Sequence, residues 1–426
     1  MQLSSNNTIG IVGGGPAGSF TALHLLQMAR ELDLDLNVLI FEPREFEKPG
    51  PVGCNRCAGI LSSRVIRGLE TLGITVPEEI IQSEIHSFNL HLDGDIIRIQ
   101  QPDQSRRIVS VFRGGGPRLH QGPPLSSFDG FLLDQACSRG SQHIPHRVRN
   151  VLWDGKPVIQ TSREEYQVDF LVLATGINSR APLSPKFGYL PPTTMLMAQD
   201  EIPRPVNWPH DQVHAFFNSP PGLIFGAIIP KNDYLNISLL GKDLTRDAVN
   251  DIITTQDLRQ DLEYDEQSSL CGCNPLIAIS PAHNYYGDRW VAVGDTAVTR
   301  LYKDGIGSAF YSAKSAMQAA LKIGISKGVF KKHYAPYCQR ITWDNRYGNL
   351  LYKLWKITLN TPRFLEAWIR TLRAELVAPI DRQIHIRVVW GMFTGDEPYR
   401  ALFRLGIQPQ AIRHLLFPPG KERGKL

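Results

Sequence analysis

Cysteine is scarce in this sequence of 426 residues. Only six are present, and they are Cys54, Cys57, Cys137, Cys271, Cys273 and Cys338. Proteins that depend on a disulfide framework carry more cysteines for their length, at more regular spacings. The scarcity therefore argues against a disulfide-stabilised extracellular protein and indicates a reducing compartment.

Long apolar runs are missing as well. No stretch approaches the roughly 18 to 20 apolar residues that a membrane-spanning helix requires. The first eight residues are polar and lack the basic and apolar segments of a signal peptide. We therefore expect a cytoplasmic protein, with association at a membrane surface as the alternative.

The chain also lacks a strong excess of charge of one sign. Its formal net charge is +5, and 20% of its residues are charged. We expect this small excess to be spread along the chain, which excludes a dedicated nucleic-acid binder and allows at most an affinity for anionic ligands or a membrane surface. No internal repeat or low-complexity tract is present.

A glycine motif lies close to the N-terminus. Positions 13–18 read GGGPAG, between an apolar strand pattern at 9–12 and a helical pattern from Pro16. In this GxGxxG arrangement Gly13 permits a tight turn, Gly15 lets the backbone approach a pyrophosphate, and Gly18 lets the helix pack on the strand. A second strand pattern at 37–41 ends in Glu42, whose carboxylate suits ribose hydroxyls. The four features together predict a dinucleotide site.

Two distant segments favour FAD over NAD. Residues 168–176, with the sequence VDFLVLATG, resemble the second dinucleotide-contacting strand of flavoproteins. Residues 290–295 (WVAVGD) resemble the flavoprotein strand whose last Gly-Asp pair contacts the ribityl chain. Asp304-Gly305-Ile306-Gly307 then opens a helix whose N-terminus would favour negative charge on the flavin ring.

The remaining pattern predicts an α/β protein with a Rossmann-type FAD-binding domain of the two-dinucleotide-binding type. Residues 1–60, 106–180 and 275–330 are assigned to this domain. Residues 61–105 and 181–274, rich in short strand patterns, are assigned to an inserted mixed β-sheet substrate domain. Residues 331–426 are expected to form a helical C-terminal region.

Further motifs resemble the geranylgeranyl reductase family, within the aromatic-hydroxylase-like flavoprotein superfamily. They are Cys57-Ala58-Gly59 after the first Rossmann unit, Phe128-Asp129-Gly130-Phe131-Leu132, the strand from Phe225 to Pro230-Lys231, and Thr394-Gly395 with Tyr399-Arg400. The resemblance implies reduction of carbon–carbon double bonds of an isoprenoid, with NADPH, NADH or another donor docking transiently. It also implies Cys57 as a catalytic candidate and Phe225, Ala227 and Pro230 in the substrate pocket.

The sequence departs from this family at two places. Leu125 stands where the family has an arginine, so Arg113 or Arg118 is expected to replace it near the phosphates. Ala227 stands where an aromatic residue is usual, so the identity of the substrate is left undecided. The two tryptophans of related flavin halogenases are replaced here by Phe225 and Ala227, which argues against halogenation. The residues expected at the cofactor are Gly13, Gly15, Pro16, Ala17, Gly18, Glu42, Arg113, Ala174, Gly176, Gly294, Asp295, Gly305, Ile306 and Gly307.

Two other functions fit the same motifs. An aromatic-ring monooxygenase needs the same FAD segments but reacts reduced flavin with oxygen first. A non-catalytic flavin or isoprenoid binding protein would retain the fold without turnover. A metal site is not expected, because no second CxxC or histidine pair accompanies Cys54 and Cys57 at zinc-ligand spacing and Cys271 and Cys273 are too close together.

Aromatic and basic residues alternate between positions 350 and 373. Helices packed on the protein's own core, with snorkelling basic side chains, explain this pattern best. A helix lying on anionic lipid is the alternative.

Overall fold

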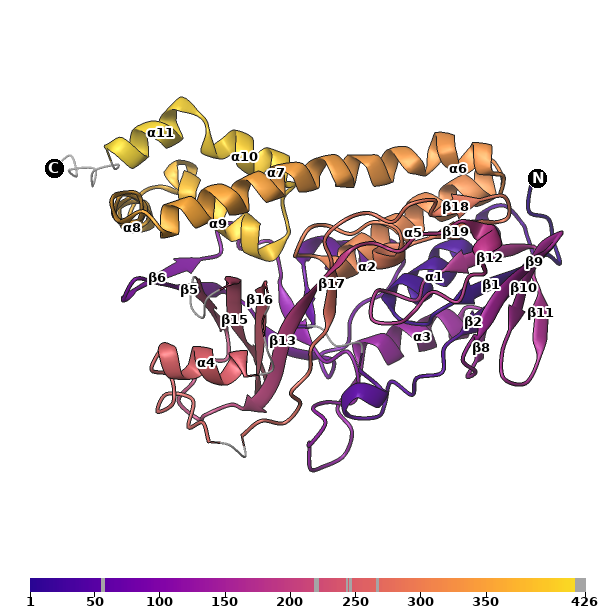
Figure 1. Cartoon of the computed structure of the whole chain (residues 1–426), viewed down its shortest axis with the longest axis horizontal. Helices are drawn as coiled ribbons and strands as arrows, with labels where there is room; N and C mark the ends of the chain where they lie inside the picture. The colour runs from indigo at the N-terminus through magenta and orange to yellow at the C-terminus, as the bar shows by residue number, and fades with distance from the viewer. Residues whose placement is uncertain (55–57, 218–221, 243, 245–246, 266–267, 418–426) are drawn as a thin grey trace.

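Two β-sheets lie side by side in the computed structural model, and helices from the C-terminal part of the chain run over both (Figure 1). The structure describes all residues except 55–57, 218–221, 243, 245–246, 266–267 and 418–426. This mixed α/β arrangement confirms the fold class predicted from the sequence.

The first sheet has six strands in the order β18-β19-β12-β1-β2-β8, all parallel except the β18–β19 pair. Its strands are β1 (Thr8–Val12), β2 (Asn37–Phe41), β8 (Ser141–Ile144), β12 (Phe170–Leu173), β18 (Tyr286–Gly287) and β19 (Trp290–Ala292). Parallel strands covered on both faces are apolar throughout. Strand β2 coincides with the pattern at 37–41, and β12 and β19 lie within the apolar segments 168–176 and 290–295.

Helices cover one face of this sheet. Ile11, Val38 and Val172 belong to the core that includes residues of α1 (Pro16–Glu31), α2 (Ser63–Thr71), α3 (Phe128–Ser138) and α5 (Gly305–Lys322). Val12 and Leu171 point to the other face, where the meander of β9 (Asn150–Asp154), β10 (Lys156–Gln160) and β11 (Glu165–Gln167) covers them. The carboxyl ends of the parallel strands are left to face the second sheet.

The second sheet has seven strands in the order β17-β13-β16-β15-β14-β5-β6. They are β5 (Ser87–Leu92), β6 (Asp95–Gln100), β13 (Thr194–Pro203), β14 (Gln212–Phe216), β15 (Leu223–Lys231), β16 (Tyr234–Gly241) and β17 (Leu276–Ala278). Helix α4 (Ala248–Thr255) packs on one face through Ile252. A small sheet of β3 (Ile60–Leu61), β7 (Val109–Val111) and β4 (Ile81–Glu84) lies close to β15.

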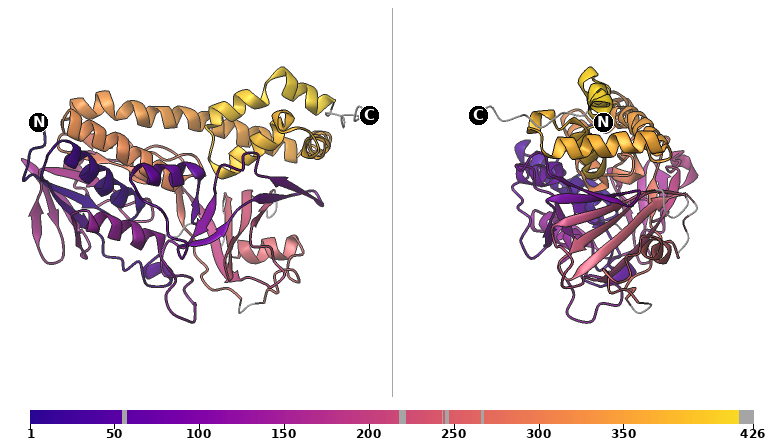
Figure 2. Two further views of the ribbon diagram at one scale, coloured as in Figure 1. Left: turned by 180° about the vertical axis from the view of Figure 1, so that it is seen from behind. Right: turned by 90° about the vertical axis from the view of Figure 1, so that its left-hand side faces the viewer.

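The C-terminal region is helical, as predicted, and begins slightly earlier than position 331. Its helices are α6 (Lys327–His333), α7 (Ala335–Leu359), α8 (Pro362–Leu376), α9 (Ile384–Thr394), α10 (Tyr399–Gly406) and α11 (Pro409–Leu416). Helix α7 extends along one side of the molecule from the first sheet to the second (Figures 1 and 2). Within the described part of the chain, no helix is both long and apolar enough to cross a membrane.

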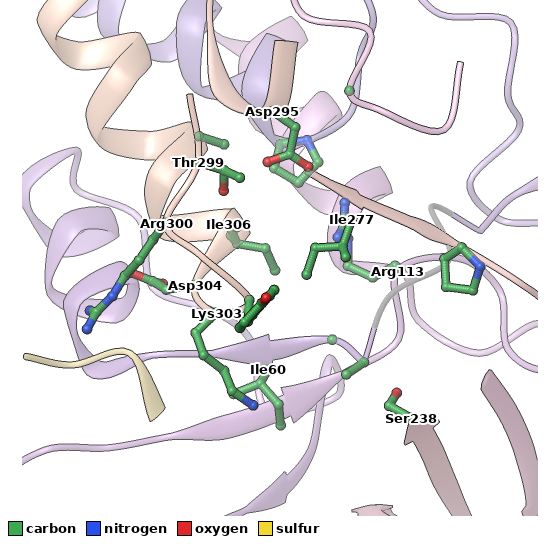
Figure 3. Close-up of a pocket in the computed structure, with 18 of the residues that line it drawn as sticks. Ile60, Arg113, Ser238, Ile277, Asp295, Thr299, Arg300, Lys303, Asp304 and Ile306 are labelled. Carbon is green, nitrogen blue, oxygen red and sulfur yellow. The ribbon is translucent and has the colours of Figure 1, made fainter. Parts of the chain in front are cut away.

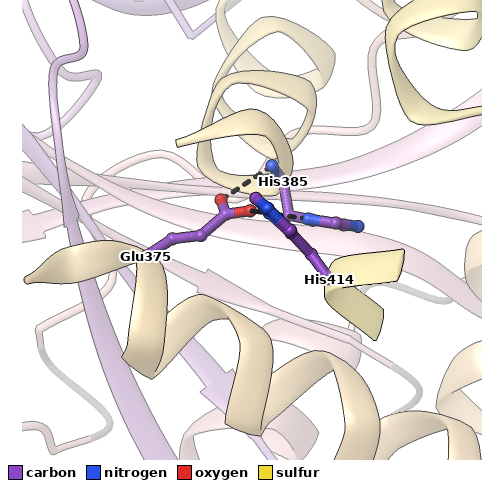
Figure 4. A group of neighbouring side chains, drawn as sticks. All are labelled: Glu375, His385 and His414. Carbon is purple, nitrogen blue, oxygen red and sulfur yellow. Dashed lines mark hydrogen bonds and ion pairs between the residues drawn. The ribbon is translucent and has the colours of Figure 1, made fainter. Parts of the chain in front are cut away.

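A buried carboxylate ties three of these helices together (Figure 4). Oε2 of Glu375 in α8 accepts hydrogen bonds from the backbone N–H groups of His385 and Ile386 at the start of α9. Oε1 lies 2.7 Å from Nδ1 of His385 and 3.3 Å from Nδ1 of His414 in α11. Among the described residues this is the group with the spacing of a three-ligand metal site. These contacts connect α8, α9 and α11 through one buried carboxylate.

Candidate functional site

A cavity lies between the carboxyl ends of the parallel strands and the second sheet (Figure 3). Open α/β sheets bind ligands at this edge, because loops and helix N-termini converge there. The lining residues come from the loop after β1, the ends of β2 and β12, the segment from Asp295 to Ala309, strands β13 to β17, and the end of α9. Segments that are far apart in the sequence therefore build one site.

The loop after β1 has the geometry that the glycine motif predicts. Gly13 adopts a φ of +107°, which L-residues other than glycine rarely adopt. A Cβ atom on Gly18 would overlap the carbonyl oxygen of Gly13. Gly15 precedes α1 directly, and Gly15, Pro16 and Ala17 line the cavity. The first N–H groups of a helix have no intrahelical acceptor, so this loop offers donors to an anion.

Glu42 lies where the sequence predicts it, at the end of β2 and in the cavity wall. Its side chain is buried. One carboxylate oxygen accepts a hydrogen bond from the Gly14 N–H at 2.9 Å, and the other accepts one from the Arg44 N–H at 3.0 Å. The carboxylate is thus fixed beside the glycine loop and retains lone pairs that hydroxyl groups of a ligand can use.

The segment after β12 forms the next part of the wall. Ala174, Thr175 and Gly176 line the cavity, and Gly176 has a φ of +66°. The Thr175 hydroxyl is buried and has no hydrogen-bond partner among the described residues. A buried hydroxyl without a partner is unfavourable unless a ligand or water completes it. The segment 174–176 therefore offers a hydroxyl group that can form a hydrogen bond with a polar atom of a ligand.

Acidic groups lie where the chain passes from β19 to α5. Gly294 has a φ of +63° and lies behind the cavity wall against Ala17, whereas Asp295 lines the cavity. Burial raises the pKa of Asp295, and Thr299 and Arg113 oppose that shift. Burial also raises the pKa of Asp304 to about 6, although Arg64 and Arg300 favour its ionised form.

The start of α5 completes this corner. Gly305 and Ile306 line the cavity. Gly307 faces the Asp304 carboxylate so closely that a Cβ atom would overlap it. The N-terminus of an 18-residue helix therefore points its partial positive charge at the cavity, as predicted.

Arg113 lines the cavity and is buried together with Asp129 of α3. Its Nε and Nη2 atoms both donate to the Asp129 carboxylate, the second over 2.8 Å. The Phe128-Asp129 pair singled out in the sequence thus supplies the carboxylate that fixes Arg113. The arginine is held at the wall as a rigid, charge-balanced unit.

Beyond these polar segments the cavity is apolar. Phe225 and Ala227 of β15 line it, as the sequence predicts, together with Ile60, Phe88, Val213, Ile229 and Phe393. Successive side chains of a strand point to opposite faces. Pro230 accordingly lies outside the cavity lining, and its carbonyl oxygen accepts a hydrogen bond from Ser110.

One cation in this chamber was not anticipated. The Nζ atom of Lys303 lies 3.5 Å from the centroid of the Phe225 ring, and Figure 3 shows the side chain extending toward Ile60. Burial lowers the pKa of Lys303 to about 7. No hydrogen-bond acceptor or carboxylate partner of Nζ occurs among the described residues. The sequence contained one indication of its role, because Lys303 lies between the Gly294-Asp295 pair after β19 and the Asp304-Gly305 pair at the start of α5.

A short C-terminal segment holds the loop that carries Lys303. The Arg300 guanidinium donates to the carbonyl oxygens of Gly395 and Glu397. The Tyr399 hydroxyl donates to the Leu301 carbonyl oxygen over 2.5 Å. The Thr394-Gly395 and Tyr399 residues singled out in the sequence thus contact the cavity loop directly.

The predicted catalytic candidate Cys57 lies outside the described residues, and its role stays a prediction. Cys271 is half-buried, and burial raises the pKa of its thiol. Its sulfur accepts a hydrogen bond from the Arg118 N–H over 3.1 Å, which places Arg118 beside the cysteine and not in the cavity lining. A thiol whose pKa is raised is a poor nucleophile near neutral pH.

Solved structures with the same fold include a reductase-like protein, a flavin-dependent brominase and a dihydroxylase. A geranylgeranyl bacteriochlorophyll reductase-like protein from Thermoplasma acidophilum matches 97% of this chain and 99% of its own, with a TM-score of 0.65 and 15% identity. The flavin-dependent brominase Bmp2 matches 95% and 98%, with a TM-score of 0.61 and 17% identity. The peptidyl tryptophan dihydroxylase QhpG matches 94% and 79%, with a TM-score of 0.55 and 19% identity.

No protein-family model matches the sequence, and no curated protein matches it. The structural matches therefore describe the fold. The chain shares its fold with a geranylgeranyl bacteriochlorophyll reductase-like protein, a flavin-dependent brominase and a peptidyl tryptophan dihydroxylase, and the resemblance seen in the sequence is confirmed at the level of the fold.

Proposed function

We propose that the protein is an FAD-dependent oxidoreductase that reduces carbon–carbon double bonds of an apolar, isoprenoid-like substrate. The observation that carries this proposal is the continuity of the cavity. The dinucleotide loops, Asp295 and the apolar chamber with Lys303 line one space. A cofactor bound along the loops would therefore have its reactive end next to an apolar substrate.

The residues present suit FAD. The glycine loop and the first turn of α1 would hold the pyrophosphate, and the Glu42 carboxylate would accept the ribose hydroxyls. The unpartnered Thr175 hydroxyl and Asp295 lie further along the same wall. The start of α5 would face the ring system. These assignments use side chains and N–H groups that already line the cavity.

When bound and reduced, FAD supplies a hydride for the double bond. The chain would hold the substrate in the apolar chamber and exclude water around Phe225 and Phe393. The neighbouring carbon needs a proton, and the Lys303 ammonium faces this chamber. A group with a pKa of about 7 is well matched to donate a proton near neutral pH. NADPH or NADH would dock transiently, since the sequence contains one complete GxGxxG motif.

An anaerobic absorption experiment tests the proposal. The purified protein is reduced with NADPH or dithionite, and geranylgeranyl diphosphate is then added. Flavin bands that return on addition of the isoprenoid support the reductase. A protein that purifies without flavin and takes up none rejects it. Flavin that no physiological donor reduces would instead favour a non-catalytic binding protein.

An aromatic-type monooxygenase is the second candidate. The fold comparison favours it, because similar structures include a peptidyl tryptophan dihydroxylase and a 2-methyl-3-hydroxypyridine-5-carboxylic acid oxygenase. The two candidates differ in oxygen use. Stoichiometric oxygen consumption with an aromatic substrate, and no flavin reoxidation by the isoprenoid under anaerobic conditions, would move the assignment to the monooxygenase.

A further inference from the structure

Helix α7 carries a stripe of exposed apolar side chains on its outer side. Trp343, Leu350, Leu354 and Ile357 are 40 to 60% exposed. Their spacings of seven, four and three residues place them on one side of an α-helix. Leu351 and Trp355, on another side of the same helix, are buried in the core. The sequence favoured packing on the core for this region, and the structure shows that only part of the apolar surface is used in that way.

Basic side chains border this stripe. The Arg346 guanidinium lies over the Trp343 ring, 4.3 Å from its centroid, and Lys353 and Lys356 are exposed about two and three turns further on. Within the described residues, none of these three cations has a carboxylate within salt-bridge distance. Exposed cations without partners next to apolar side chains are arranged for an anionic surface.

The charge is not spread evenly along the chain, contrary to the sequence-based expectation. Residues 331–426 contain 17 Lys and Arg against 7 Asp and Glu, whereas residues 1–330 contain 29 against 34. The C-terminal region is therefore net positive by ten charges and the rest is net negative by five. Charge complementarity thus selects the C-terminal helices as the side that an anionic partner would approach.

Further exposed apolar side chains belong to the last helices. Ile407, Ile412 and Leu416 are 50 to 64% exposed. They belong to α11 and to the turn before it, and α11 contacts α8 and α10, while α10 contacts α7. Figures 1 and 2 show α10 and α11 lying above α7 at the end of the molecule farthest from the N-terminus. The last helices therefore add exposed apolar side chains to the C-terminal layer beyond those of α7.

We propose that the outer side of α7, formed by Trp343, Arg346, Leu350, Lys353, Leu354, Lys356 and Ile357 and here called the α7 face, binds the surface of anionic lipid bilayers. The apolar side chains would enter the boundary between headgroups and acyl chains, and the cations would contact the anionic headgroups. The proposal is independent of the proposed function, because it requires neither bound FAD nor turnover.

Vesicle flotation of the full chain tests it. The protein is mixed with vesicles of phosphatidylcholine containing phosphatidylglycerol, and with vesicles of phosphatidylcholine alone. We expect the protein to float with the anionic vesicles at least about tenfold more strongly, and to dissociate as salt is raised. Trp343 should report the contact directly as a blue shift of fluorescence that is lost in Trp343→Phe while flotation is retained.

Variants locate the contact. Lys353→Glu/Lys356→Glu should reduce binding to anionic vesicles more than tenfold, since each basic residue near such a surface contributes about 1 kcal/mol. Leu350→Glu/Leu354→Glu should abolish it. Matched controls are Lys186→Glu/Lys242→Glu, a double charge reversal at exposed sites elsewhere, and Val206→Glu, at a side chain that is 92% exposed. Melting temperatures confirm that each variant is folded.

Three outcomes would overturn the proposal. The wild-type chain fails to float with anionic vesicles, or the control variants lose binding as strongly as the α7-face variants. A third is a dimer in sedimentation that Leu350→Glu/Leu354→Glu dissociates without any vesicle binding, which would assign the α7 face to a second copy of the chain.

Discussion

The Nζ atom of Lys303 lies 3.5 Å from the centroid of the Phe225 ring, inside the cavity that joins the dinucleotide loops to the apolar chamber. The ring thus faces a partly buried ammonium group. Burial lowers the pKa of Lys303 to about 7, so the ammonium form predominates below that pH and is lost as the pH rises through it.

Lys303→Met removes the charge and keeps the length of the side chain. If Lys303 donates the proton, reoxidation of reduced flavin by the isoprenoid slows by about 100-fold or more. The wild-type rate should fall above a pH of about 7, and this limb should be absent from the variant. Anaerobic stopped-flow absorption measures both. Lys322→Met, at an exposed site of α5, is the control. Equal rates for Lys303→Met and Lys322→Met would show that Lys303 does not donate the proton.

Glu42→Ala should release the cofactor. The change removes the acceptor of the Gly14 and Arg44 N–H groups and the carboxylate expected at the ribose. We expect FAD affinity to fall by at least about tenfold, since hydrogen bonds to charged groups contribute about 1.5 to 3 kcal/mol. Titration of the apoprotein with FAD, followed by flavin fluorescence, gives the affinity. Glu31→Ala, at the exposed end of α1, should bind FAD as the wild type does.

Gly18→Ala should disrupt the loop after β1. A Cβ atom at this position would overlap the Gly13 carbonyl oxygen, and a backbone atom cannot move aside as a flexible side chain can. We expect a loss of bound FAD and a destabilisation of about 1 to 3 kcal/mol or more, as for other overpacked sites. Gly328→Ala in α6 has free space around the new methyl group and should be neutral or slightly stabilising. Thermal melting with and without FAD compares the two.

Glu375→Gln should destabilise the C-terminal helices. The amide nitrogen would face N–H donors that now share a carboxylate, and α8, α9 and α11 would lose their common partner. Hydrogen bonds to a charged group contribute about 1.5 to 3 kcal/mol, and the loss should be of this order. Urea denaturation monitors the loss. Glu366→Gln, exposed on the same helix, should leave the unfolding midpoint unchanged.

Chelation distinguishes this tie from a metal site. Because hydrogen bonds account for both Glu375 oxygens, dialysis against EDTA should leave the melting temperature unchanged. A drop of several degrees that zinc restores would mean that Glu375, His385 and His414 hold an ion.

The sequence predicted those parts of the molecule whose structure is determined by residues close together along the chain. The GGGPAG loop, Glu42 at the end of β2 and the apolar run of β12 depend on neighbours along the chain, and all three were identified. Lys303 was missed because its environment comes from Phe225, almost eighty residues away. The partner of Arg113 was missed for the same reason, although Asp129 had been noted within its own motif.

Strand alternation accounts for a different departure. Pro230 was assigned to the substrate pocket from a motif, and its neighbour Ile229 lines the cavity instead. The alternation of side chains along β15 places Phe225, Ala227 and Ile229 on the cavity face. Counting by two from Phe225 would have identified this set from the sequence.

The contacts of Arg300 with Gly395 and Glu397 impose an order on the protein's biogenesis. The glycine loop is synthesised first, but the loop from Arg300 to Asp304 is fixed only when residues that follow it by more than ninety positions have emerged from the ribosome. A nascent chain that stops before Thr394 would carry the loop after β1 and lack the closed end of the cavity. Cofactor loading is therefore expected after synthesis is complete, and a truncated chain should reach the cell's quality-control machinery without its ligand.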